Sequence, residues 1–375
     1  MNQSDISTMQ ATKTEASEVD IDLNFVQENL LPKVLGAEFK NSEYNKLKIV
    51  ENLSQPYSAI RVIQFQDESN NPVTLYLKRI TIPNKKIATV KESLLNETSL
   101  LQKINTAMKG ATAEHIAVFP EQQIIVTKKC PGLPVDSIIN TYGFWWRNDK
   151  PQNIRRNNIP ALCGNWLKRF HMATGEANQD LTPWYDYLSG EMIWRTRILK
   201  ERLPKHSELF ENISDSFTNE LRQIKTQGYL CTYHGDFAPH NIFYAENKIR
   251  VIDFYDAKTG HPIIDLINFV ASIAYRSESP LYQKPKIKDF CDSFLKAYGK
   301  LLNTNTEITS LILLLQSIKR LLVLENNIPT RLDTRVMRYR ASKQHMQYLE
   351  DYLLERNNAR ALGPWPFLNL TCLTN

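Results

Sequence analysis

Short apolar runs, rich in β-branched and aromatic residues, alternate with polar turns in the first third of the chain. The runs cover residues 47–53, 59–66 and 73–80, and a further pair ends in Gln123-Ile124-Ile125-Val126-Thr127. The polar stretch 67–72 consists of Asp, Glu, Ser, Asn and Pro residues, most of which favour a turn between neighbouring strands. Runs of this length and composition predict an antiparallel sheet.

The period of the pattern changes to that of a helix in two places. Leu94, Leu101 and Ile104 share one stripe of residues 91–104, which predicts a helix between two strands. Apolar residues also recur over residues 21–36, so we expect a short N-terminal helix within residues 21–45. Residues 1–20 are polar and predict a disordered tail.

The strand pattern ends at Cys130-Pro131-Gly132-Leu133-Pro134, a composition that is typical of a break between domains. We therefore expect an N-terminal lobe over residues 46–130, a hinge over 131–136 and a C-terminal lobe over 137–375. The C-terminal lobe is expected to be mainly helical, with one hairpin near residues 229–254 as the exception. A sheet followed by helices predicts the α+β class with two lobes.

The composition is ordinary for a globular protein and disfavours several classes. Of the 375 residues 42% are hydrophobic, and the net charge of +6 is too mild for a typical nucleic-acid binder. The five cysteines lack CxxC spacing, which predicts reduced thiols in a cytoplasmic protein rather than disulfides or a zinc site. No signal peptide is visible, and polar residues interrupt the most apolar stretch, residues 311–324, so we expect no membrane span.

The richest chemistry lies in the run His234-Gly235-Asp236-Phe237-Ala238-Pro239-His240-Asn241 and in Asp253 beyond it. Two apolar runs, residues 242–245 and 249–252, lie between Asn241 and Asp253, with Glu246-Asn247-Lys248 as their turn. If these runs form a hairpin, its two ends lie side by side. The amide oxygen of Asn241 and the carboxylate of Asp253 would then converge on one point, with Asp236 nearby.

Two carboxylates and an amide at one point suit Mg²⁺, a cation that prefers a few protein oxygens together with nucleotide phosphates. Phosphoryl transfer needs such a metal, together with an aspartate that accepts the proton of the attacking hydroxyl. Two other interpretations stay open. The same side chains could merely cap and turn a surface loop, and His234, Asp236 and His240 could bind zinc, although zinc would leave Asn241 and Asp253 unexplained.

The spacing of His-Gly-Asp, Asn241 and Ile252-Asp253-Phe254 resembles the signature of the aminoglycoside phosphotransferase and choline kinase group of small-molecule kinases. Asp265-Leu266, after Gly260-His261-Pro262, is similar to a further segment of that family, with His261 in place of an aspartate. The resemblance spans roughly residues 45–275.

This resemblance implies a two-lobed, protein-kinase-like fold that uses ATP and Mg²⁺. On the matching positions it implies Asp236 as the catalytic base and Asn241 and Asp253 as the metal ligands. It also implies that His234 braces the catalytic loop and that Asp265 forms hydrogen bonds with it.

The first lobe offers residues for nucleotide binding. A kinase needs a strand lysine near the phosphates and a helix glutamate that holds it. Lys78 ends the third strand run, whereas its rival Arg79 would lie on the opposite face of the strand. Glu97 lies on the inward stripe of the predicted helix, where an unpaired carboxylate is costly, so we expect it to pair with Lys78 unless it reaches solvent.

The sequence departs from the kinase pattern in the loop over residues 54–59. This loop should cover the phosphates, but it contains no glycine. Glycine normally lets backbone amides approach phosphates closely, so Ser58 or neighbouring amides would have to serve instead. By resemblance, residues 126–131 form the strand and hinge whose backbone receives adenine.

Two features bear on the acceptor. Basic residues at 147–156 and 331–343 would oppose a polycationic aminoglycoside if they lined a cleft, and otherwise form a solvated helix face. An aromatic group could cage a quaternary ammonium, stack on a sugar or simply pack in the core. Its members are Tyr142, Phe144, Trp145, Trp146 and Trp184.

The sequence therefore predicts an ATP-dependent phosphotransferase that acts on a hydroxyl of a small molecule, such as a sugar or an amino-alcohol-like metabolite. The alternatives are a pseudokinase that binds nucleotide for regulation, which the glycine-free loop suggests, and an aminoglycoside-inactivating kinase. A protein kinase is disfavoured because no Ala-Pro-Glu segment follows Asp253-Phe254-Tyr255.

Overall fold

The computed structural model describes Val26, Leu30 and residues 48–55, 58–66, 72–81, 87–140, 158–278, 284–299, 306–326 and 332–354. The predicted tail over residues 1–20 and most of the predicted N-terminal helix lie outside this part of the chain. Contacts divide the chain into two compact units, Met1–Thr98 with Glu114–Lys129, and Ser99–Ala113 with Cys130–Asn375. One break of this division follows Lys129, beside the predicted hinge, and another falls inside a helix.

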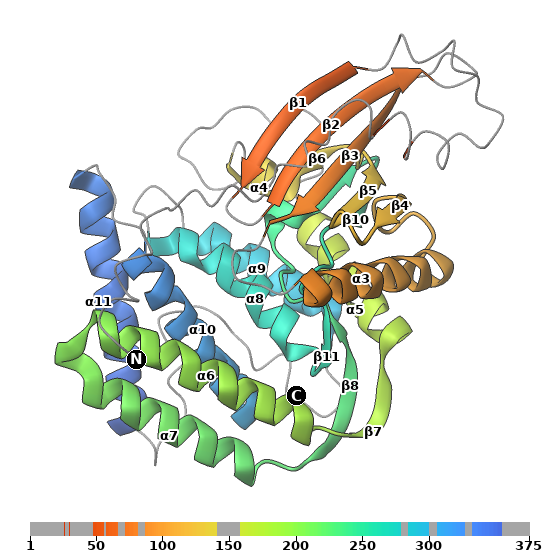
Figure 1. The fold of residues 1–375 in the computed structure, drawn as a ribbon. Coiled ribbons are helices and arrows are strands. Elements are labelled where there is room, and N and C mark those ends of the chain that lie inside the picture. The colour runs from red at the N-terminus through yellow and green to blue at the C-terminus, as the bar shows by residue number, and fades with distance from the viewer. Residues whose placement is uncertain are drawn as a thin grey trace. The chain divides into compact units, whose positions relative to one another are not determined.

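The first unit is built on a five-stranded antiparallel sheet in the order β1-β2-β3-β5-β4 (Figure 1). Its strands are β1 (Lys48–Gln55), β2 (Ser58–Gln66), β3 (Pro72–Ile80), β4 (His115–Phe119) and β5 (Ile124–Lys128). These bounds confirm the predicted strand runs to within a residue or two. In the middle strand, Lys78 pairs with Ile60 on one side and with Ile125 on the other.

A hydrophobic cluster of this unit lies on one face of the sheet. Leu75 and Leu77 of β3 pack there with Val26 and Leu30, and all four side chains are fully buried. Side chains alternate between the two faces of a strand, so Lys78 lies on the face opposite to Leu75 and Leu77. The predicted helix between β3 and β4 is also present, as α3 (Ile87–Ala107).

The second unit is mainly helical, as predicted. Figure 1 shows α6 and α7 running side by side, and α5 packs along α9. The helices of this unit are α4 (Val135–Ile138), α5 (Ile159–Thr174), α6 (Thr182–Arg202), α7 (Ser207–Gln223), α8 (Ile263–Ala274), α9 (Lys284–Tyr298), α10 (Thr306–Asn326) and α11 (Leu332–Leu354), with the 3-10 turns η7 (Pro204–His206), η8 (Pro239–Asn241) and η9 (Tyr275–Glu278).

Two small antiparallel sheets interrupt these helices, where the sequence predicted a single hairpin. One has the order β10-β9-β6 and the other β11-β8-β7. Their strands are β6 (Leu133–Pro134), β7 (Glu176–Asp180), β8 (Gln227–Tyr233), β9 (Ile242–Ala245), β10 (Lys248–Val251) and β11 (Lys258–Gly260). The second sheet escaped prediction because β7 reads Glu-Ala-Asn-Gln-Asp and shows no apolar alternation.

Within the described residues, the cysteines are buried and form no disulfide bond. They are Cys130, Cys163, Cys231 and Cys291. Burial raises the pKa of the Cys130 thiol to about 12, and it also raises the pKa of the other three thiols. Among the helices that the structure describes, none combines the length and the apolar character that crossing a lipid bilayer requires.

Candidate active site

The β9–β10 hairpin brings the two ends of the predicted motif together. Ile242 pairs with Val251, and beyond that pair the backbone N–H of Ile252 donates a hydrogen bond of 3.0 Å to the carbonyl oxygen of Asn241. Asn241 and Asp253 therefore flank the open end of the hairpin, as the sequence predicted. The turn at the other end is formed by Glu246 and Asn247, with φ angles of 51° and 60°.

Buried phenylalanines anchor the chain on both sides of this open end. Phe237 follows Asp236, Phe254 follows Asp253, and both rings pack against Trp166 of α5, at centroid distances of 5.7 Å and 6.4 Å. Asp236 and Asp253 are therefore each followed by a phenylalanine that packs against the same tryptophan. This shared packing fixes the positions of the two aspartates relative to each other.

His234 links the loop to the exit of the hairpin. Its Nδ1 accepts a hydrogen bond of 3.3 Å from the backbone N–H of Asp236. The proton must then lie on Nε2, which donates to the carbonyl oxygen of Ile252 at 3.0 Å. The ring is fully buried, and it occupies a bracing position.

The alternative of a zinc site at His234, Asp236 and His240 is wrong. Both ring nitrogens of His234 are engaged by backbone groups. Within the described residues, moreover, no three His, Cys, Asp or Glu side chains are arranged to hold a metal ion.

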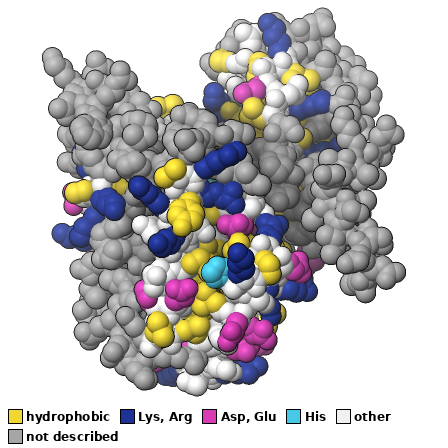
Figure 2. Space-filling model, turned by 90° about the vertical axis from the view of Figure 1, so that its left-hand side faces the viewer, with side chains coloured by type: hydrophobic (Ala, Val, Ile, Leu, Met, Phe, Trp, Pro, Cys, Tyr) yellow, Lys and Arg dark blue, Asp and Glu magenta, His cyan; other side chains and the backbone are white. Residues whose placement is uncertain are grey.

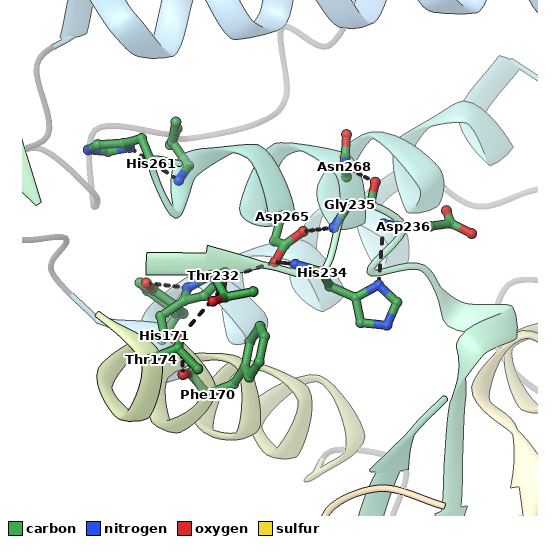
Figure 3. Close-up of polar contacts among 12 residues, drawn as sticks. Phe170, His171, Thr174, Thr232, His234, Gly235, Asp236, His261, Asp265 and Asn268 are labelled. Carbon is green, nitrogen blue, oxygen red and sulfur yellow. Dashed lines mark hydrogen bonds and ion pairs between the residues drawn. The ribbon is translucent and has the colours of Figure 1, made fainter. Parts of the chain in front are cut away.

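Asp265, in the first turn of α8, forms the predicted hydrogen bonds with the loop that begins at His234 (Figure 3). Its Oδ2 accepts from the backbone N–H of His234 at 2.6 Å and its Oδ1 from that of Gly235 at 3.0 Å. The side chain is fully buried, and His171 of α5 lies 3.1 Å from Oδ2. His171 also contacts the hydroxyl of Tyr298 at 2.9 Å, so its position is structural.

Gly235 could not be another residue without a shift of the backbone. Its φ is 85°, and a Cβ atom there would lie 2.4 Å from the carbonyl oxygen of Asp256. Two side chains that the sequence did not reveal fix the other side of this turn. Asn268 donates to the carbonyl oxygen of Gly235 at 2.9 Å, and Gln316 donates to Asn268.

Asp236 turns its carboxylate away from this buried network, as Figure 3 shows. Its side chain is half-exposed, and its Oδ2 receives the Asn241 amide Nδ2 at 2.9 Å and lies 3.1 Å from His240 Nε2. Burial tends to raise the pKa of Asp236, but the hydrogen bond and charge of His240 and the amide of Asn241 together hold it below its ordinary value.

His240 has the complementary shift. Its hydrogen bond to Asp236 raises the pKa of the imidazole against the opposing effect of burial. The charges of Asp236, Asp136 and Asp253 act in the same direction. The structure therefore places a titrating cation directly on the candidate base, a feature that sequence reasoning missed.

The donor set at the open end of the hairpin fits one divalent cation. Asn241 is buried, and because its Nδ2 donates to Asp236, its carbonyl oxygen Oδ1 is the atom that could bind a cation. Asp253 supplies a carboxylate from a left-handed backbone with φ of 68°. An amide oxygen and a carboxylate are ligands that Mg²⁺ accepts, with the remaining positions open to water and phosphate.

The first unit places the predicted nucleotide-binding residues on neighbouring elements. Glu97 of α3 is only 6% exposed, so its carboxylate faces inward rather than solvent. Lys78 lies in the middle of the sheet on β3 and is partly buried. Ser58 is the first residue of β2 and is buried. Pairing of Lys78 with Glu97 and nucleotide binding by Ser58 stay predictions.

The aromatic group and the basic stretches were predicted to shape the acceptor site, but their described members lie elsewhere. Trp184 is buried and stacks on His261 at a centroid distance of 5.7 Å, so it packs in the core. Arg335, Arg340 and Lys343 are exposed on α11, as a solvated helix face would be. The other four aromatic residues and the basic stretch 147–156 lie outside the described residues.

A cavity of about 340 Å³ lies beside the loop at Gly235, and sequence reasoning did not predict it. Two helices far apart in the sequence, α6 and α10, supply most of its wall, together with Gly235 and Asp256. The α6 residues recur at helical spacing, which was a signal for a shared face but not for a cavity. They are Tyr187, Leu188, Glu191, Trp194 and Arg195, and α10 contributes Leu315 and Lys319.

Comparison with protein families finds one match, to the model of the APH phosphotransferase enzyme family, over residues 145–301. This match contains the loop, the hairpin and α8, and it confirms the resemblance seen in the sequence. A comparison with curated proteins finds no match.

Solved structures share the fold. An amicoumacin kinase in complex with AMP-PNP and Ca²⁺ is 16% identical with a TM-score of 0.54, over 82% of this chain and 89% of its own. A choline kinase from Cryptosporidium parvum is 11% identical with a TM-score of 0.52, over 89% of this chain and 96% of its own. These likenesses establish the predicted kinase-like fold, with its antiparallel sheet followed by a helical region.

Proposed function

We propose that this small-molecule phosphotransferase, whose residues 145–301 match the APH phosphotransferase enzyme family, transfers the terminal phosphoryl group of ATP to a hydroxyl group of a small molecule. The observation that carries the proposal is the meeting of Asp236, Asn241 and Asp253 at one end of a hairpin. The nucleotide and the divalent ion bound by the amicoumacin kinase structure give further support to nucleotide use.

Each residue has a role that follows from its surroundings. The carboxylate of Asp236 is ionised at neutral pH, because its pKa is lowered, and it accepts the proton of the acceptor hydroxyl. The hydroxyl oxygen forms the new bond to phosphorus while the bond to the ADP oxygen breaks. Asn241 and Asp253 would hold Mg²⁺, which when bound neutralises charge on the phosphates.

The buried network keeps this base in place. His234 and Asp265 fix the backbone on either side of Gly235, so the loop does not reorganise when the proton moves. Lys78 and Glu97 would orient the nucleotide phosphates from the first unit, as the resemblance implies. Catalysis by this arrangement rests on positioning and on charge, since the protein forms no covalent bond.

The test is the substitution Asp236→Asn, which removes the base and keeps the size of the side chain. We expect ADP release with a hydroxyl acceptor to fall by about 10²–10⁴-fold, the usual contribution of a general base. The measurement is coupled detection of ADP across sugars, amino alcohols and aminoglycosides. Asp289→Asn on the exposed face of α9 is the matched control and should retain full activity.

The same assay separates the alternatives. Nucleotide binding without ADP release for any acceptor would favour the pseudokinase. Full activity of Asp236→Asn would remove the proposed mechanism. Preference for aminoglycosides over neutral sugars would favour the antibiotic-inactivating kinase.

A further inference from the structure

The cavity beside the catalytic loop contains a cation that the proposed mechanism does not use. Lys319 projects from α10 into the wall of the cavity and is partly buried. Its ammonium group makes no hydrogen bond or ion pair with any residue that the structure describes. An ammonium that loses water without gaining a partner is costly, so this position calls for an explanation.

Lys319 keeps its positive charge at neutral pH in spite of its burial. Burial, followed by the like charge of Arg195, lowers the pKa of Lys319 to about 8. The group is therefore mainly protonated at neutral pH. The charge of Asp236 acts on Lys319 as well, which places the cation within electrostatic range of the candidate base.

A second cation of the cavity is only partly neutralised. Arg195 Nη2 lies 2.5 Å from Oε2 of Glu191, one turn earlier on α6, so the one acid in the helical wall is already paired. The Nε of Arg195 is buried and has no hydrogen-bond partner within the described residues. Lys319 and Arg195 both line the cavity, and they lie close enough for the charge of Arg195 to lower the pKa of Lys319.

The rim and the walls suit a small polar molecule with a ring or short chain. Lys258 donates to the hydroxyl of Tyr187 at 3.0 Å, and Asp256 is exposed beside Gly235. Trp194 and Leu315 add an aromatic and an aliphatic surface. The volume of about 340 Å³ lies within the usual range of small-molecule sites.

We infer that the acceptor carries an anionic group, a phosphate ester or a carboxylate, which binds Lys319 and Arg195 while a hydroxyl of the same molecule faces Asp236. This inference rests on the proposed function, because it identifies the class of acceptor for that reaction. Charge-assisted hydrogen bonds to an oxyanion would give Lys319 a partner and would give Arg195 a second partner beside Glu191.

Binding of matched probes tests the inference independently of turnover. The probes are inorganic phosphate, glucose 6-phosphate, gluconate, glucose and glucosamine, at constant ionic strength, with isothermal titration calorimetry as the readout. Lys319→Met should weaken the binding of anionic probes roughly tenfold or more and leave glucose unchanged. Lys343→Met, which removes an exposed charge on α11, should change nothing. The two organic anions distinguish phosphate from carboxylate recognition.

The variant should fold well, since it removes a charge that burial disfavours, and we expect its melting temperature to equal or exceed that of the wild type. Anion binding that does not depend on Lys319, or preferential binding of glucosamine, overturns the inference. So does a loss of Mg·ADP binding in Lys319→Met without a loss of probe binding, because Lys319 would then serve the nucleotide.

ADP release in the presence of each probe sugar separates this inference from the proposed function. If ADP forms only with neutral or cationic acceptors, the kinase activity stands and the anionic acceptor is wrong. If anionic probes bind through Lys319 but ADP forms with no acceptor, the anion site stands and the proposed function fails.

Discussion

His240 couples the candidate base to a second titrating group. The pKa of Asp236 is lowered, so the folded state favours the carboxylate, and this contribution to stability is present above pH 3.8 and lost as the pH falls through the lowered pKa. The pKa of His240 is raised, so its contribution is fully present below pH 6.5 and lost as the pH rises through the raised pKa. The pair therefore stabilises the fold most between these two values.

Substitution His240→Gln removes the charge but keeps a hydrogen-bond donor beside Asp236. The pKa of Asp236 should rise, so the acid limb of the pH profile of kcat/KM should move to higher pH. His206→Gln, in the exposed turn η7, is the control and should leave the profile unchanged. An acid limb that stays in place in His240→Gln would show that the imidazole does not tune the base.

Single residues differ in how well the sequence predicts them. Asp236, Asn241 and Asp253 could be predicted together, because a short hairpin fixes their positions by local pairing. Lys319 could not, because it lies in a mainly apolar helix interrupted by polar residues, where a lysine usually extends to solvent. His240 was weighed only as a metal ligand, since nothing local reveals which side of the loop its ring faces.

The β9–β10 hairpin carries strain at the element scale. Glu246 adopts φ of 51°, a left-handed conformation that costs glutamate more than asparagine. A two-residue turn with both φ angles positive favours asparagine and glycine. The turn lies at the end of the hairpin opposite to Asn241 and Asp253.

Substitution Glu246→Asn should therefore raise the free energy of unfolding by about 0.5–1 kcal/mol. The urea midpoint should increase at constant m-value, and kcat/KM should stay the same. The matched substitution Asn247→Val places a β-branched residue at φ of 60° and should lower the midpoint. Equal midpoints in all three proteins would show that the turn is not strained.

Elements were predictable where one local signal dominated. The strands of the first sheet combine β-branched runs with strong turns, and α3 and α8 show clear stripes. The sheet β11-β8-β7 was missed because its pairing is set by tertiary contacts. Gly260 of β11 is an example of such a tertiary contact. A Cβ atom at this position would lie 2.5 Å from the Trp184 ring of α6.

At the scale of the whole molecule, the chain carries a net charge of +6. Figure 2 shows one face, on which Lys and Arg side chains are interspersed with Asp and Glu. The kinase-like fold followed from the order of sheet and helices, whereas the cavity did not, because α6 and α10 meet only in the folded chain.

Removal of Mg²⁺ should lower the melting temperature of the nucleotide-bound protein. We expect Mg·ATP to raise the melting temperature more than ATP with EDTA, because a ligand held by the native state alone stabilises by mass action, about 2.7 kcal/mol at 100 times its Kd. Asp253→Asn should abolish the Mg²⁺-dependent part, and Asp289→Asn should keep it. Identical melting curves with Mg²⁺ and with EDTA would contradict the metal site.

The buried cysteines give the protein a practical property. Thiol reagents attack the thiolate, and Cys130, Cys163, Cys231 and Cys291 combine burial with raised pKa values. Once Cys372 is replaced by serine, we expect little labelling of the remaining cysteines by a thiol-reactive fluorophore or spin label. A single cysteine introduced at exposed Trp194 would then report directly on occupancy of the cavity.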